Sequence, residues 1–176
     1  MLSQISGVPL TSVMDAAFVQ FDEVISPSWD YDLRGQDNFK SYVKNIWGLE
    51  GLVIGLTLLD EPIGFASFYY DSYRNMWLTE YFIVGEKRGI GFSKVVLPSF
   101  SQAFEELDIK LGVAVKFENK RAQAAITKAL GTYFPEAKEG TLYIVDLHPW
   151  TWKTRNRVSD SIVLVITNSM RKWHNA

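Results

Sequence analysis

The stretch "VGEKRGIGFSKVV", residues 84–96, decides the fold, because it places two glycines between a basic pair and an apolar run at helical spacing. A helix start leaves several N–H groups without partners, and glycines before it let a ligand approach them. Together with the positive end of the helix dipole, these groups favour an anion, typically a phosphate. The alternative is a strand-to-helix turn that needs glycine for geometry alone. The neighbouring segments must decide between the two.

Periodicity along the rest of the chain predicts an alternation of strands and helices around this turn. Three consecutive antiparallel strands precede it, and a strand, a helix and a final hairpin follow its own helix. The predicted strands cover 5–10, 51–60, 63–71, 76–84, 109–116, 132–138 and 140–148, and the helices cover 11–25, 38–48, 91–107 and 118–131. Thr11 and Ser12 are the cap candidates of the first helix, and Pro98 is expected to kink or restart the third. The order is β-α-α-β-β-β-α-β-α-β-β.

The composition is that of one folded domain. Its 176 residues are 47% hydrophobic and 14% aromatic, which is enough for a core and argues against disorder. A formal net charge of −2 gives no overall field for nucleic acid or an anionic membrane. No run approaches the roughly 18 apolar residues of a membrane span, and the N-terminus lacks a secretory pattern. We therefore expect a cytoplasmic protein without a membrane or nucleic-acid partner.

Metal and thiol chemistry are disfavoured by the residue types present. The chain has no cysteine and only two histidines, His148 and His174, so disulfides, thiol nucleophiles and all-histidine metal clusters are excluded. His148 is a weak base candidate because it lies just before a Pro-Trp pair at the end of the last predicted strand. No metal is expected.

Residues 149–176 form a basic, aromatic extension beyond the predicted domain 1–148. The extension contains five basic residues and one acidic residue, which predicts either a solvated tail or a surface for a partner. The run 162–167 is rich in β-branched residues and suits a strand, whereas apolar residues at helical spacing from Ile162 to Trp173 favour a helix.

The order of elements and the glycine turn resemble the GNAT superfamily of acyl-CoA N-acyltransferases, over roughly residues 5–148. The turn motif of that family is Arg or Gln, two residues of any type, Gly, any residue, then Gly or Ala. Gly89 and Gly91 match this motif, whereas Glu86 stands where the family has Arg or Gln. A carboxylate near a pyrophosphate costs affinity unless it points to solvent.

A second match follows one helix and one strand later. Families of this type have an Asn that opens the next helix, an Ala three residues on and a Gly at its end, and Asn119, Ala122 and Gly131 occupy those positions. An Asn at a helix start is also a common cap. The resemblance implies an α+β fold in which helices flank a mixed, mainly antiparallel sheet.

The resemblance also implies acetyl-CoA as the cofactor, with its pyrophosphate at the glycine turn. A backbone N–H near Ile83 or Val84 would polarise the thioester carbonyl. The other implied coenzyme A contacts are Lys87, Arg88, Gly89, Ile90, Gly91, Phe92 and Asn119.

Glu80 is the best candidate for the general base of such a reaction. It is a carboxylate within the otherwise apolar strand "WLTEYFIV", where burial makes it a better proton acceptor. The alternative is a structural role, for example an ion pair with Arg74. The family's usual general acid is a Tyr, but Ile126 and Thr127 stand at its position, and Tyr133 is the substitute.

Two functions remain open. In the first, the chain transfers an acetyl group to a primary amine of a small molecule, peptide or protein. A cation-binding wall or simple packing would then explain the aromatic residues Trp29, Tyr31, Tyr69, Tyr70, Tyr73 and Trp77. In the second, the chain keeps the fold without activity and acts as an interaction or structural protein, an ambiguity common among the small GNAT-like proteins of tailed phages. The resemblance allows a homodimer in either case.

Overall fold

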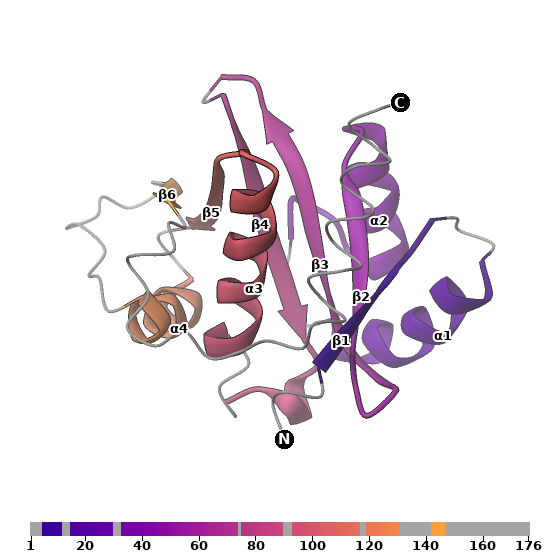
Figure 1. Cartoon of the computed structure of the whole chain (residues 1–176). Coiled ribbons are helices and arrows are strands. Elements are labelled where there is room, and N and C mark those ends of the chain that lie inside the picture. Colours follow the sequence, from indigo (N-terminus) through magenta and orange to yellow (C-terminus); the bar gives the residue numbers. More distant parts are fainter. Residues whose placement is uncertain are drawn as a thin grey trace.

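The computed structural model describes residues 5–11, 15–29, 33–73, 75–89, 93–116, 119–130 and 142–146. Within them, helices flank a central sheet (Figure 1). The strands are β1 (Ile5–Pro9), β2 (Leu52–Leu58), β3 (Glu61–Asp71), β4 (Met76–Ile83), β5 (Leu111–Lys116) and β6 (Leu142–Asp146). The helices are α1 (Ala16–Ile25), α2 (Phe39–Gly48), α3 (Ser93–Glu106) and α4 (Lys120–Leu130), with short 3-10 turns η2 (Ser26–Ser28) and η3 (Gly85–Lys87).

The strands follow their chain order across the sheet, β1-β2-β3-β4-β5-β6. Every neighbouring pair is antiparallel except β4 and β5, which run parallel. The expected α+β fold with a mixed, mainly antiparallel sheet is therefore confirmed. The strand predicted over 132–138 and the extension 149–176 lie outside the described residues.

The helices form two layers, one on each face of the sheet. Alternation along the strands sends successive side chains to opposite faces. One face forms a core with α1 and α2, around Phe21 and Phe39, and the other forms a core with α3 and α4, around Phe100 and Ile126. Figure 1 shows the two helix pairs at opposite sides of the strands. Each layer can therefore present different chemistry to the central strand β4.

Two details of the helices differ from the sequence-based expectation. The cap of α1 is Asp15, whose carboxylate accepts the N–H of Ala17 at 2.8 Å, rather than Thr11 or Ser12. α3 continues through Pro98 without a restart. Proline removes one backbone hydrogen bond. Buried Leu97 and other apolar residues of α3 pack into the core on both sides of it and hold the helix together.

No helix in the described part of the chain is both long enough and apolar enough to cross a membrane.

Candidate active site

The parallel strands β4 and β5 stop pairing halfway along their length. Their paired residues run from Trp77 with Leu111 to Thr79 with Val113. β4 nevertheless continues to Ile83, and β3 stays paired with it to the end. The last residues of β4 therefore have a strand partner on one edge only, among the described strands. We call this point the β4–β5 fork.

Strand geometry decides which backbone group of β4 faces the fork. The N–H of Val84 donates to the carbonyl of Ile63 in β3 at 2.8 Å. Val84 is therefore not available for the carbonyl-polarising role expected near Ile83 and Val84. Because N–H groups of a strand alternate between its two edges, the N–H of Ile83 faces away from β3. The N–H of Ile83 is therefore the remaining candidate to polarise the thioester carbonyl.

The predicted anion-binding turn lies between β4 and α3, as expected, but two of its N–H groups already donate hydrogen bonds within the turn. The N–H groups of Lys87 and Arg88 close η3 by donating to Val84 and Gly85 at 2.9 and 3.3 Å. They do not join a converging set of free amides. Gly89 has φ of 82°, a left-handed conformation that favours glycine, and a Cβ there would meet nothing within 4 Å.

The geometry of the turn therefore explains Gly89 without a ligand. Ile90, Gly91 and Phe92, the other expected contacts, lie outside the described residues.

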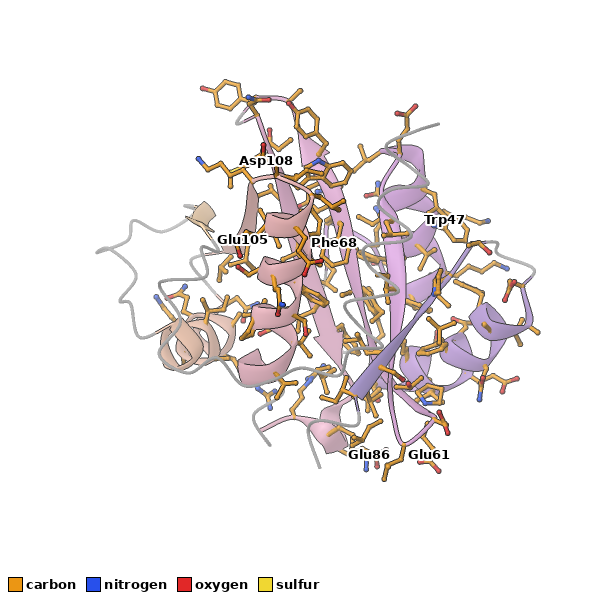
Figure 2. All side chains as sticks on the ribbon, in the orientation of Figure 1. Trp47, Glu61, Phe68, Glu86, Glu105 and Asp108 are labelled. Atoms are coloured by element: carbon orange, nitrogen blue, oxygen red, sulfur yellow. The ribbon has the colours of Figure 1, made fainter. Side chains whose placement is uncertain are left out.

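The side chain of Arg88 folds back on the end of β4. Its Nε donates to the carbonyl of Ile83 at 2.6 Å, and its guanidinium lies 4.8 Å from the ring centre of Phe82. Glu86, the residue that departs from the family motif, is exposed on η3. Figure 2 shows Glu86 at the edge of the molecule, at the end opposite Asp108. Its carboxylate meets solvent, which is the arrangement that costs an anion site least.

Asn119 acts as the cap of α4. Its side-chain oxygen accepts the N–H of Ala122 at 3.1 Å, and its carbonyl accepts the N–H of Gln123 at 3.2 Å. The capping role accounts for the two oxygens of this residue, and its side-chain amide nitrogen remains for the expected cofactor contact.

Glu80 lies on the α1–α2 face of β4, half-buried, directly opposite Ser67 of β3. Its carboxylate accepts two hydrogen bonds, from the hydroxyl of Tyr42 at 2.5 Å and from that of Tyr69 at 2.9 Å. Ser67 lies 2.6 Å from the Tyr42 hydroxyl. Three elements, α2, β3 and β4, thus meet at one carboxylate. The alternative partner Arg74 lies outside the described residues.

The direction of these bonds follows from what each group can donate. An ionised carboxylate only accepts, so Tyr42 spends its single proton on Glu80. The bond between Tyr42 and Ser67 must then have Ser67 as its donor. A one-way chain of donors therefore leads from Ser67 through Tyr42 to Glu80.

Both tyrosines are held in their neutral form. Burial raises the pKa of Tyr42 well above its ordinary value, and the negative charge of Glu80 raises it further. Burial and then Glu80 likewise raise the pKa of Tyr69, while the charge and hydrogen bonding of Arg34 oppose that rise. The tyrosines therefore serve Glu80 as donors at neutral pH.

The expected wall of aromatic residues is not one surface. Tyr69 belongs to the α1–α2 face, whereas Trp77 packs in the core under α3, with Tyr70 at 6.0 Å between ring centres. Neighbouring strand residues cannot share a face, which separates Tyr69 from Tyr70. Trp29 is packed among core rings, including a stacked contact with Phe82 at 5.4 Å. Tyr31 lies outside the described residues, as does the acid candidate Tyr133.

Sequence reasoning found Glu80 but missed the residues that hold it. Tyr42 falls on the apolar face of the helix predicted over 38–48, and that spacing signals only burial. A buried tyrosine hydroxyl needs a polar partner. The carboxylate of Glu80, alone in an apolar strand, was the one sign in the sequence of such a partner. Arg34 gave no signal beyond its place in a turn-rich loop.

The fork has one feature that fits a bound acyl-CoA. Thr79, the last β4 residue paired with β5, is fully buried, and its hydroxyl has no hydrogen-bond partner within the described part of the chain. A buried hydroxyl without a partner is costly. An acyl-CoA held at the fork by Ile83, Lys87 and Arg88 would bring polar atoms to this strand, so the residues present fit the group.

Comparison of the sequence with protein-family models and with curated proteins finds no match. Solved structures do match. A spermidine N-acetyltransferase chimera from Vibrio cholerae and hSSAT is 12% identical with a TM-score of 0.58, covering 87% of this chain and 100% of its own. An acetyltransferase from Salmonella typhimurium that modifies the N-terminal serine of a ribosomal protein is 11% identical with a TM-score of 0.59, covering 82% and 94%.

A third structure, a proposed acetyltransferase from Salmonella typhimurium with its cofactor acetyl-CoA, is 11% identical with a TM-score of 0.53. It covers 83% of this chain and 94% of its own. At such identities the likeness concerns the fold. The order of strands and helices, the parallel pair β4–β5 and these structures together show that the chain has the fold of the GNAT acetyltransferases.

Proposed function

We propose that the protein is an N-acetyltransferase that moves an acetyl group from acetyl-CoA to a primary amine. The observation that carries this proposal is Glu80, a half-buried carboxylate held by two tyrosine hydroxyls on the strand that forms the fork. An amine acceptor must lose a proton to act as a nucleophile and again on forming an amide. A positioned carboxylate beside the fork serves both needs.

The chain's own residues then divide the work as follows. Bound acetyl-CoA supplies the thioester whose carbonyl carbon receives the amine nitrogen as the carbon–sulfur bond breaks. Glu80 accepts the first proton that the ammonium nitrogen loses, passes it to solvent, and accepts the second proton as the amide forms. Tyr42 and Tyr69 fix the carboxylate in place. The N–H of Ile83 is the backbone donor assigned to the thioester oxygen. Solvent or Tyr133 returns a proton to the departing thiolate.

The cofactor assignment is supported by the fork, by the basic pair Lys87–Arg88 at the end of η3, and by the solvent-facing Glu86. Structures with this fold also carry the ligand, as in the acetyl-CoA complex from Salmonella typhimurium. A spermidine N-acetyltransferase from Vibrio cholerae with coenzyme A and spermine, 15% identical with a TM-score of 0.53 over 82% of this chain and 96% of its own, is another.

The second candidate is a protein that keeps the fold without activity. One observation favours it: Arg88 lies over Phe82 and donates to Ile83, so this cation already serves the protein itself. A pyrophosphate would have to compete with that contact. The two candidates differ in whether coenzyme A binds.

The test combines binding with turnover. Coenzyme A and acetyl-CoA should raise the melting temperature of the wild-type protein in a concentration-dependent way. Release of the thiol in the presence of a panel of primary amines measures transfer. Glu80→Gln should lower turnover by about 100-fold or more while coenzyme A binding is kept. Glu105→Gln, the same change at an exposed position of α3, is the matched control.

Each outcome decides between the candidates. If coenzyme A at millimolar concentration leaves the melting temperature unchanged, the inactive protein is the correct description. If coenzyme A binds but Glu80→Gln turns over as fast as Glu105→Gln, the fold is an acetyltransferase whose base is not Glu80.

A further inference from the structure

A tight turn after α1 carries a cation toward Glu80. The N–H of Gln36 donates to the carbonyl of Leu33 at 3.0 Å, and the two central residues have positive φ, 53° at Arg34 and 72° at Gly35. Positive φ at both central positions is the type I′ pattern. The side chain of Gln36 donates to the carbonyl of Arg34, and the indole of Trp29 donates to that of Gln36. The turn is thereby fixed from both sides.

The side chain of Arg34 is also fixed. Its Nε donates to Asn45 of α2 at 2.9 Å, and its guanidinium lies over the ring of Tyr69, 4.7 Å from the ring centre. The hydroxyl of that ring donates to Glu80. Arg34 itself is exposed, whereas Tyr69 is buried and Glu80 is half-buried. The guanidinium is thus the solvent-side neighbour of the carboxylate.

The two charges are close enough for one small molecule to meet both. The guanidinium lies 4.7 Å from the ring centre of Tyr69, and the hydroxyl of that ring lies 2.9 Å from the Glu80 carboxylate. The two charges are therefore at most about 10 Å apart, roughly one Debye length at 0.1 M salt. Glu80 attracts an ammonium group, and Arg34 attracts an anion and repels a second ammonium. A guanidinium also matches the geometry of a carboxylate or phosphate.

We propose that Arg34 selects the acceptor: a primary amine whose own molecule carries a carboxylate or phosphate a few bonds from the nitrogen. This inference rests on the proposed function, because it names the substrate class of the same site. It also separates this chain from the polyamine enzymes that share its fold. Spermidine places further positive charge where Arg34 already stands, and it has no group for the guanidinium to bind.

Matched probes isolate the role of the anion. Glycine, β-alanine and γ-aminobutyrate are compared with their amides, which keep the amine and lose the carboxylate, and spermidine is included. Binding to the full chain is followed by ligand-observed NMR titration, with and without coenzyme A. At least one acid should bind the wild type about fivefold more tightly than its amide, and more tightly than spermidine.

Two variants at the same position separate charge from geometry. Arg34→Gln should abolish the preference for the acid over the amide, and Arg34→Lys should keep part of it because the charge remains. Unchanged binding of coenzyme A and an unchanged melting temperature show that both variants fold.

If no acid binds more tightly than its amide, or if neither binds, the inference is overturned. The same holds if Arg34→Gln keeps the preference. If the wild-type protein does not bind coenzyme A, the proposed function itself is wrong. The two failures can therefore be told apart.

Discussion

Removal of one hydroxyl, by Tyr42→Phe, tests the hydrogen-bond chain around Glu80. The substitution keeps the ring in the α1–α2 core and deletes the donor of Glu80 and the acceptor of Ser67. A hydrogen bond to a charged group contributes about 1.5–3 kcal/mol, and a neutral one about 1 kcal/mol. Because Ser67 is fully buried and water cannot replace its partner, both losses are felt. We expect the free energy of unfolding to fall by about 2–4 kcal/mol near pH 8.

The pH dependence provides a second, independent measure. The ordinary pKa of tyrosine is 10.0, and that of folded Tyr42 is raised above it. Above pH 10 the unfolded chain therefore loses this proton while the folded chain keeps it. The unfolded state then binds fewer protons, so stability falls as pH rises, by about 1.4 kcal/mol per pH unit for each such group. Below pH 10 this contribution is fully present. Tyr42→Phe should make the decline above pH 10 less steep by that amount.

Urea denaturation of wild type and variant at several pH values between 8 and about 11 measures both effects. Tyr70→Phe is the matched control, because the same hydroxyl is removed from a side chain that is 44% exposed. A loss for Tyr42→Phe no larger than that of the control, with the same slope above pH 10, would refute the assigned hydrogen-bond chain.

Two further substitutions test the strands around the fork. Gly64→Ala places a Cβ 1.9 Å from the carbonyl oxygen of Phe82, so the backbone must shift, and we expect the free energy of unfolding to fall by about 1–3 kcal/mol. Gly85→Ala is the control, because a Cβ there meets nothing within 4 Å and should change the stability very little. Urea denaturation midpoints compare the two variants. Thr79→Val exchanges a buried hydroxyl without a partner in the described part of the chain for a methyl group, so stability should rise by about 1 kcal/mol or more. A lower urea midpoint would show that the hydroxyl is satisfied after all.

The parts of the fold that periodicity encodes were predictable from the sequence. The strands 51–60, 63–71 and 76–84 were expected within two residues of β2, β3 and β4, since alternation and turn residues are local signals. The place of the glycine turn between β4 and α3 was predictable for the same reason. Its hydrogen bonds were not, because the 3-10 turn η3 uses amides that a sequence pattern leaves unassigned.

The candidate site was predictable only where one residue stands out against its neighbours. Glu80 is such a residue, a carboxylate in an apolar strand. Its partners Tyr42 and Tyr69 are 38 and 11 positions away, and the contact with Tyr42 exists only once α2 has docked on the sheet. Arg34 is further hidden, because a basic residue in a turn usually meets solvent alone. Of the two explanations for the aromatic residues, packing is the correct one for Trp29 and Trp77, and no single wall forms because adjacent residues such as Tyr69 and Tyr70 point to opposite faces of β3.

The position of the base is a consequence of the pairing between β3 and β4. Eight consecutive pairs run from Gly64 with Ile83 to Asp71 with Met76, and this register places Ser67 opposite Glu80. A slip of one residue would send Glu80 to the α3 face, away from both tyrosines. Gly64 opposes the slip, because the carbonyl oxygen of Phe82 lies too close to this position for any residue with a Cβ to replace the glycine. The position of the Glu80 carboxylate therefore depends on Gly64 of the neighbouring strand β3 as well as on the hydroxyls that contact it.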